Sequence, residues 1–251
     1  MLSATAVQSI HHHLRYGACP MPDNDYPNGD LLVSAAWLAQ HHGDPTVKVI
    51  DGRSAADYAA GHVPGARLLP NGAFRAASGV PDTCSAEEFA SQAGTLGIVA
   101  GDTVVCYDGV TGARTWWAFS RFGHQQVQFL NGSFRTYQAA GGPVSTDAVM
   151  PVPTAYALGA VQDHMACSLP QAVGWAGTGE VLFWDVRSEG EYTGADPRNN
   201  PAHRAGHLPK AVHLEWTDLT DTATGMFKPA AEMRALLANK GITPEKEVVA
   251  Y

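Results

Sequence analysis

The chain has 251 residues, of which 45% are hydrophobic, so it contains enough apolar side chains for folded domains and is not globally disordered. Its formal net charge is −8 and no basic run is present, which argues against a nucleic acid partner. No stretch approaches the roughly 20 apolar residues of a membrane span, and no basic secretion signal opens the chain. We therefore expect a cytoplasmic protein without a membrane partner.

The first half of the chain predicts a leader and one domain. Residues 1–27 become rich in Pro, Asn and Asp and are expected to be poorly ordered. Five short apolar strands are predicted at 31–33, 47–50, 66–69, 104–107 and 127–130. Helices are predicted at 35–41 after Ser34, at 54–60, behind a cap at Ser85, and at 115–122 after a loop over 108–114. Continuous apolar strands between helices are typical of a parallel sheet covered on both faces.

The second half repeats this plan. Residues 141–153 are rich in Gly and Pro and predict a linker, so that the chain divides into domain 1 (28–145), a linker (146–164) and domain 2 (165–251). Domain 2 has predicted strands at 181–184, 211–214 and 248–251, a turn at 188–192 and a helix at 229–239. It also has an inserted loop at 193–205 that domain 1 lacks.

One motif occurs in both halves, and its length indicates a duplicated domain. Each copy contains Asp-x-Arg, a Tyr, Gly-His-x-Pro-x-Ala, Gly-Ile and an apolar strand that ends in Tyr. The first copy is Asp51-x-Arg53, Tyr58, 61–66, 97–98 and 104–107; the second is Asp185-x-Arg187, Tyr192, 206–211, 241–242 and 248–251. The two halves are therefore expected to share one fold and one layout of the site.

The position after the last strand is where chemistry is expected, because ligands of open parallel sheets bind beyond the carboxyl ends of strands. Loop amides and a helix N-terminus there favour an anion, and a cysteine would become a thiolate. In domain 1 this position is Asp108, which we expect to fill the cradle as a helix cap. In domain 2 it follows Tyr251, so no catalytic cysteine is assigned.

The four cysteines lack the spacing of a zinc site or a disulfide framework, so no metal or cofactor is expected. Cys106 belongs to a predicted buried strand and is expected in the core. Neither Cys84 nor Cys167 lies in a pattern of acid–base partners. These cysteines are therefore interpreted as structural.

The duplicated motif, with Tyr107-Asp108-Gly109 and Trp116-Trp117, resembles the tandem-domain rhodanese family of thiosulfate and 3-mercaptopyruvate sulfurtransferases. The resemblance implies two α/β domains, each a parallel sheet in strand order 3-2-4-5-1 with helices on both faces. It also implies that domain 1 carries Asp where domain 2 carries the nucleophilic Cys. The family activity moves a sulfane sulfur from a small anionic sulfur donor, through a cysteine persulfide, to cyanide or a thiol acceptor.

By this resemblance domain 2 is expected to be incomplete at its C-terminus, lacking the nucleophile and strand five. We expect the chain as given to be inactive and to aggregate through an open strand edge. A fragment end and a UGA codon after Tyr251 both fit this ending.

Four side chains of domain 2 are candidates for substrate binding: Arg187, Arg198, Arg204 and His207. Arg187 is alternatively a brace for Asp185, and His207 a structural hydrogen-bonding residue. The two loop arginines could pair with an anionic sulfur donor. Glu191 stands where mercaptopyruvate-type members often have Arg, which slightly favours thiosulfate. The alternative function is a non-catalytic module that binds anions or a protein; a phosphatase of related fold is disfavoured by Asp108.

Overall fold

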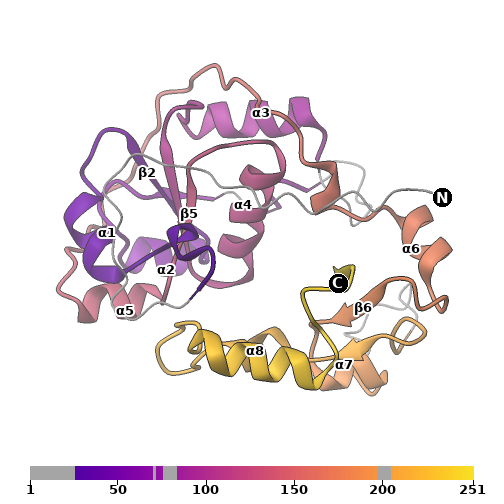
Figure 1. The fold of residues 1–251 in the computed structure, drawn as a ribbon. Coiled ribbons are helices and arrows are strands. Elements are labelled where there is room, and N and C mark those ends of the chain that lie inside the picture. The colour runs from indigo at the N-terminus through magenta and orange to yellow at the C-terminus, as the bar shows by residue number, and fades with distance from the viewer. Residues whose placement is uncertain (1–25, 70–71, 76–83, 197–204) are drawn as a thin grey trace.

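The computed structural model describes residues 26–69, 72–75, 84–196 and 205–251. These residues form two units that follow each other along the chain, each built on a β-sheet with helices beside it (Figure 1). The first sheet has the strand order β1-β5-β4-β2-β3 and the second the order β7-β6-β8. All neighbouring strands are parallel. The α/β class is confirmed, and the first sheet has the expected order 3-2-4-5-1 in the opposite direction.

The elements of domain 1 follow the predicted plan closely. The strands are β1 (Leu32–Val33), β2 (Val47–Asp51), β3 (Arg67–Leu68), β4 (Thr103–Tyr107) and β5 (Val127–Leu130). The helices are η1 (Gly29–Leu31), α1 (Ala35–His41), α2 (Ala55–Ala60), α3 (Ala86–Thr95), α4 (Gly109–Arg121) and α5 (Phe134–Ala139).

The sheet of domain 1 is buried on both faces. On one face Ile50 and Cys106 pack in a cluster with Phe89 of α3 and Phe119 of α4, all fully buried. The alternate residues of the same strands point the other way, and Val105 packs with side chains of α1 and α5. The period of two along each strand explains this alternation. An apolar strand flanked by helices on both sides gives the continuous hydrophobic pattern of the sequence.

Domain 2 contains fewer strands and a smaller core in the described residues. Its strands are β6 (Leu182–Asp185), β7 (Val212–His213) and β8 (Val248–Ala250). Its helices are η2 (Asp163–Met165), α6 (Leu169–Trp175), α7 (Glu189–Thr193), η3 (Trp216–Leu219) and α8 (Ala230–Asn239). Phe183 of the central strand β6 is 2% exposed, whereas β8 contains no buried residue. Strand β8 forms one edge of this sheet.

Serine residues form the N-caps of equivalent helices in the two domains. Ser34 accepts a hydrogen bond from the third residue of α1, and Ser168 does the same for α6. Ser54 and Ser188 cap α2 and α7 in the same way. Such caps satisfy backbone N–H groups that the first helical turn leaves unpaired. The duplication therefore extends to helix starts, as the sequence predicts for Ser34.

The segment between the domains packs against domain 1. Ser145 forms an antiparallel bridge with His62. The backbone N–H of Thr154 donates a hydrogen bond to the Gly94 carbonyl of α3. Tyr156 is 9% exposed and belongs to the same apolar cluster as Phe89. These contacts tie a segment rich in Gly and Pro to the helices α3 and α4.

A hairpin of domain 2 contacts domain 1 directly. Thr220 and Phe227 form an antiparallel bridge, and the hairpin between them reaches the corner between β5 and α5. The backbone N–H of Phe227 donates to Asn131 Oδ1 at 2.8 Å, and Thr136 Oγ1 donates to the Thr224 carbonyl at 2.6 Å. The Tyr26 hydroxyl, which falls within the expected leader, donates to the Lys228 carbonyl. The two domains are thus joined beside the carboxyl edge of the first sheet.

Candidate functional site

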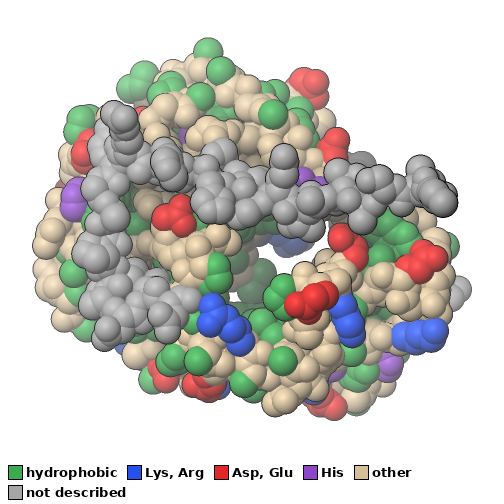
Figure 2. Space-filling view, viewed as in Figure 1, with side chains coloured by type: hydrophobic (Ala, Val, Ile, Leu, Met, Phe, Trp, Pro, Cys, Tyr) green, Lys and Arg blue, Asp and Glu red, His purple; other side chains and the backbone are tan. Residues whose placement is uncertain are grey.

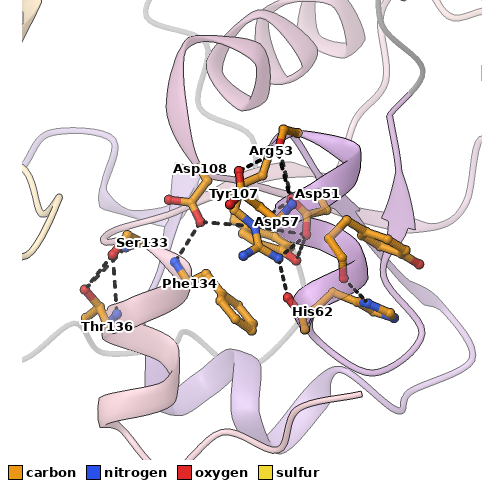
Figure 3. Close-up of polar contacts among 12 residues, drawn as sticks. Asp51, Arg53, Asp57, His62, Tyr107, Asp108, Ser133, Phe134 and Thr136 are labelled. Carbon is orange, nitrogen blue, oxygen red and sulfur yellow. Dashed lines mark hydrogen bonds and ion pairs between the residues drawn. The ribbon is translucent and has the colours of Figure 1, made fainter. Parts of the chain in front are cut away.

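At the carboxyl ends of β2 and β4 in domain 1, Asp51, Arg53 and Tyr107 form a buried cluster (Figure 3). We call this cluster the Asp–Arg–Tyr bracket. Asp51 is fully buried, and its Oδ2 lies 2.6 Å from Arg53 Nη2. Arg53 Nη2 also donates to the Gly61 carbonyl at 2.7 Å, and the Tyr107 hydroxyl donates to Asp51 Oδ2. Burial lowers the pKa of Arg53, but the hydrogen bond and charge of Asp51 outweigh it and leave that pKa raised. The bracket joins two strand ends to the Gly61-His62 turn.

Domain 2 repeats the Asp–Arg pair of this bracket and its contact with the Gly-His turn. Asp185 Oδ2 accepts from Arg187 Nη2 at 2.5 Å, and the same guanidinium donates to the Gly206 carbonyl at 2.9 Å. Tyr251 Oη accepts from the Leu208 backbone N–H at 3.0 Å. Burial raises the pKa of Asp185, but its hydrogen bonds with Arg187 outweigh this and hold the pKa below its ordinary value. Burial also raises the pKa of Tyr251 to about 12.

The histidines of the two Gly-His motifs make the same contacts. His62 stacks on Tyr58 with ring centroids 3.8 Å apart, and His207 stacks on Tyr192 at 3.9 Å. In each case Nδ1 donates to the carbonyl of the stacked tyrosine, at 3.0 and 2.8 Å. His62 is buried, whereas His207 is exposed. The hydrogen bond of His207 to the Tyr192 carbonyl is of the structural kind that the sequence analysis gives as the alternative to substrate binding.

Asp108 occupies the nucleophile position of domain 1, but the expected loop over 108–114 is wrong. Helix α4 begins at Gly109, immediately after the strand. Gly112 makes this close approach feasible, since a Cβ there would lie 2.6 Å from the Tyr107 carbonyl oxygen. Nothing in the local sequence indicates that the first helical turn packs directly on the strand end.

The expectation that Asp108 caps its own helix is also wrong. Its side chain makes no cap hydrogen bond to α4; instead Oδ2 accepts from the Phe134 backbone N–H of α5 at 2.8 Å. The same oxygen lies 3.9 Å from Arg53 Nε. Asp108 has a positive φ of 59°, a backbone conformation that non-glycine residues rarely adopt. Burial raises the pKa of Asp108, although the Phe134 N–H and Arg53 favour the charged form.

The cysteines that the structure describes lie away from both strand-end positions. Cys106 and Cys84 are buried in the core, and burial raises the pKa of both thiols. Cys167 is partly exposed and its Sγ contacts the Ser168 carbonyl before α6. The expectation that Cys106 is a core residue is confirmed. Cys19, Arg198 and Arg204 lie outside the described residues.

The surroundings of the two sites bear on what can bind. A hollow lies between the two domains, with Lys or Arg side chains near its rim (Figure 2). Within the described ranges no cluster of three or more His, Cys, Asp or Glu could hold a metal ion. In the same residues no helix combines the length and apolar character of a membrane span.

Comparison with known proteins agrees with this architecture. The model of the rhodanese-like domain matches residues 34–140. Sulfur carrier protein TtuD of Thermus thermophilus is 31% identical, over 90% of this chain and 83% of the relative. A thiosulfate sulfurtransferase of Azotobacter vinelandii is 30% identical, over 91% of this chain and 84% of the relative.

Solved structures show the same fold. SseA from Escherichia coli, from a study of 3-mercaptopyruvate sulfurtransferases, superposes with a TM-score of 0.76 at 24% identity, covering 88% of this chain and 87% of that one. An anaerobic ergothioneine biosynthesis enzyme from Chlorobium limicola gives 0.77 at 22% identity, covering 88% of this chain and 60% of that one. The chain belongs to the rhodanese family. Within it, the two-domain architecture and the relatives over most of the chain make it a sulfurtransferase of the rhodanese type.

Proposed function

We propose that domain 2 carries the sulfur-transfer site, at the carboxyl edge of its sheet, and that domain 1 is a non-catalytic scaffold. The observation behind this is the duplicated bracket. In domain 1 the position after the bracket tyrosine holds Asp108, whose carboxylate is paired with the Phe134 N–H. A carboxylate there supplies its own negative charge and is a poor acceptor of sulfur. The corresponding position of domain 2 follows Tyr251.

The proposed reaction has two displacement steps. A cysteine thiolate at the nucleophile position attacks the outer sulfur of thiosulfate, the S–S bond breaks, and sulfite leaves with the bonding electrons. Cyanide or a thiolate then attacks the outer sulfur of the persulfide and releases the cysteine thiolate. With 3-mercaptopyruvate the C–S bond breaks instead, and pyruvate leaves after protonation of its carbon. Covalent catalysis of this kind divides one transfer into two easier ones.

Arg187, His207 and the loop residues Arg198 and Arg204 are proposed to bind the anionic sulfur donor. Arg187 is 31% exposed in its side chain, so one edge of its guanidinium faces solvent beside the bracket. Guanidinium groups match sulfonate and carboxylate oxygens in pairs. The relatives named thiosulfate sulfurtransferase support thiosulfate as the sulfur donor. A cytoplasmic location and the absence of a nucleic acid partner remain part of the proposal.

The same observation favours a second candidate for part of the chain. Because Asp108 fills the strand-end position, domain 1 by itself fits a non-catalytic rhodanese-like module that binds anions or a protein. The chain of residues 1–251 is accordingly expected to transfer no sulfur. Its four cysteines are structural in this proposal.

Persulfide formation tests the assignment of the site. Residues 1–251 are incubated with thiosulfate, and intact mass and peptide mapping then locate any added sulfur. We expect none on Cys19, Cys84, Cys106 or Cys167, and no thiocyanate when cyanide is added. Added sulfur on any of these four, with release as thiocyanate, would contradict the proposal.

A gain-of-function variant tests the nucleophile position itself. Asp108→Cys places a thiol at the N-terminal end of α4 beside Arg53, where the field stabilises a thiolate. We expect this variant to acquire sulfur from thiosulfate, and the surface variant Asp147→Cys to acquire none. Equal sulfur uptake by the two variants, or none by either, would show that the position after the bracket tyrosine has no such property.

A further inference from the structure

Domain 2 contains a histidine–glutamate pair that its counterpart lacks. In the second sheet Asp185 lies in register with His213 of β7, and in the first sheet Asp51 lies in register with Leu68 of β3. The residue after the helix cap differs in the same way. It is Glu189 after Ser188 in α7, and Ala55 after Ser54 in α2. An apolar pair in domain 1 thus corresponds to an ionisable pair in domain 2.

His213 contacts the bracket arginine through the main chain. Its Nε2 lies 2.8 Å from the Arg187 carbonyl oxygen, which can only accept, so Nε2 carries the hydrogen. Its Nδ1 lies 3.0 Å from Glu189 Oε2. The ring stacks on Tyr192, with centroids 4.7 Å apart and planes inclined by 21°. His213 is therefore held on both nitrogens and on one face.

These contacts hold both the backbone and the guanidinium of Arg187. Its backbone N–H donates to Asp185 Oδ1 at 3.1 Å, and its carbonyl accepts from His213. Its guanidinium is held by Asp185 and by the Gly206 carbonyl. The side chain of His213 is 14% exposed and that of Glu189 is 74% exposed, so the pair opens to solvent at its outer end. A change in solution pH can therefore reach this pair.

We propose that His213, oriented by Glu189, is a positioning residue for Arg187 and makes the binding of an anionic sulfur donor at this edge dependent on pH. The inference rests on the proposed function of domain 2. Both ring nitrogens face oxygens that accept hydrogen bonds, an arrangement fully satisfied when the ring carries two protons. Histidine is the side chain that changes charge between pH 5 and 8.

The charges around His213 set the sign of the effect. The groups that face it or contact its neighbours are Glu189, Glu191 and Tyr192 of α7, Asp185 and Arg187 at the end of β6, His207 on the far face of Tyr192, and Tyr251 after β8. With a protonated ring two cations, His213 and Arg187, face three carboxylates, and one negative charge is left over. With a neutral ring two negative charges are left over, which repel an anion more strongly. Binding of an anionic sulfur donor is therefore favoured at the lower pH.

The test measures thiosulfate binding by calorimetry on the full chain at pH 6 and pH 8. We expect wild type and the exposed-surface control His164→Gln to bind roughly threefold to tenfold more tightly at pH 6, as for one added charge at the edge of a protein. The variant His213→Gln keeps an N–H for the Arg187 carbonyl but not the charge, so its affinity should depend less on pH than that of wild type. The double variant Glu189→Ala with His213→Leu installs the pair of domain 1 and should weaken binding at both pH values.

Amide hydrogen exchange gives a readout that does not need the sulfur donor. Exchange at the Arg187 N–H is expected to accelerate in the double variant and to stay near wild type in His213→Gln. The Arg53 N–H of domain 1 should be unchanged in both. Equal pH dependence of binding in wild type and His213→Gln, or unchanged Arg187 exchange in the double variant, would overturn the inference. Should wild type bind no thiosulfate at either pH, the proposed function falls and the exchange data alone decide the positioning role.

Discussion

The two brackets contain the same residues but sit in different surroundings. The Asp51 and Asp185 side chains are both fully buried, whereas that of Arg53 is 16% exposed and that of Arg187 31%. In domain 1 the guanidinium also lies over the ring of Phe134, 4.0 Å from its centroid, and near the Asp108 carboxylate. The Arg187 guanidinium lies near the Tyr251 ring, 5.4 Å from its centroid. The bracket is thus a structural clamp in both domains, and within the described residues its arginine is more exposed in domain 2 than in domain 1.

The largest expected effect comes from removing the buried carboxylate. Asp51→Ala is expected to destabilise domain 1 by about 3–5 kcal/mol, because it leaves the Arg53 guanidinium without its partner. Asp185→Ala should cost domain 2 less, since water reaches Arg187 more easily. Urea unfolding with domain-resolved amide exchange measures both losses. Equal losses of unfolding free energy in the two domains would contradict the stated difference between the two brackets.

The next effect concerns the bracket tyrosine. Tyr107→Phe removes the hydroxyl that donates to the Asp51 carboxylate and is expected to cost about 1–3 kcal/mol. Tyr58→Phe is the matched control, because its hydroxyl donates only to the neutral Ala66 carbonyl. That loss should be about 0.5–1.5 kcal/mol. Thermal or urea unfolding ranks the two, and a reversed order would show that the charged acceptor does not matter.

The interdomain contact is expected to contribute less. Thr136→Val removes the hydrogen bond to the Thr224 carbonyl and should cost about 0.5–1.5 kcal/mol. The effect should appear as faster proteolysis of the hairpin at 220–227 with little change in the core of either domain. Thr95→Val, which loses only an exposed bond within α3, is the control. Equal rates of proteolysis in the two variants would show that the bond from Thr136 to the Thr224 carbonyl does not stabilise the docking of the hairpin.

A pH effect should distinguish the domains further. The buried histidines of the described chain, His62 and His124, both belong to domain 1. Burial lowers the pKa of His124, partly offset by its hydrogen bond to the Asp102 carbonyl. The unfolded state therefore takes up the proton more readily, so this stability is present above about pH 6.5 and is lost as pH falls below it.

We therefore expect the unfolding free energy of domain 1 to decrease between pH 7 and pH 5. The decrease should be smaller in His124→Gln, which keeps a polar group beside Tyr156. Urea unfolding across this pH range measures the difference. A decrease of the same size in wild type and the variant would assign the pH dependence to another group.

Much of the fold follows from local sequence. The predicted helix at 35–41 and its cap Ser34 agree with α1, and the capping box at Ser85 is present. The predicted strands agree with β2, β4 and β5 to within a residue at each end. Local propensity and apolar periodicity govern these features, so a single segment contains the information. The start of α4 was missed because it depends on contact with the strand end, not on its own propensity.

The site shows the same division. The resemblance offered Arg187 as a brace for Asp185, and the structure contains this ion pair and its counterpart between Arg53 and Asp51. His213 was missed, although its register beside Asp185 and the contrast with Leu68 carried a signal. Aligning the two repeats position by position finds it. The residues that differ between copies are as informative as those that match.

The sequence alone determined that the chain is a duplicated α/β protein, and it placed β2, β4 and β5 to within a residue at each end, because apolar periodicity and motif spacing are properties of short segments. Tertiary structure decided that Asp108 accepts a hydrogen bond from the Phe134 N–H of α5, that Tyr156 enters the core of domain 1, and that the hairpin at 220–227 docks on Asn131. Those contacts join residues far apart in the chain, and no local pattern records which distant partner satisfies a buried polar group.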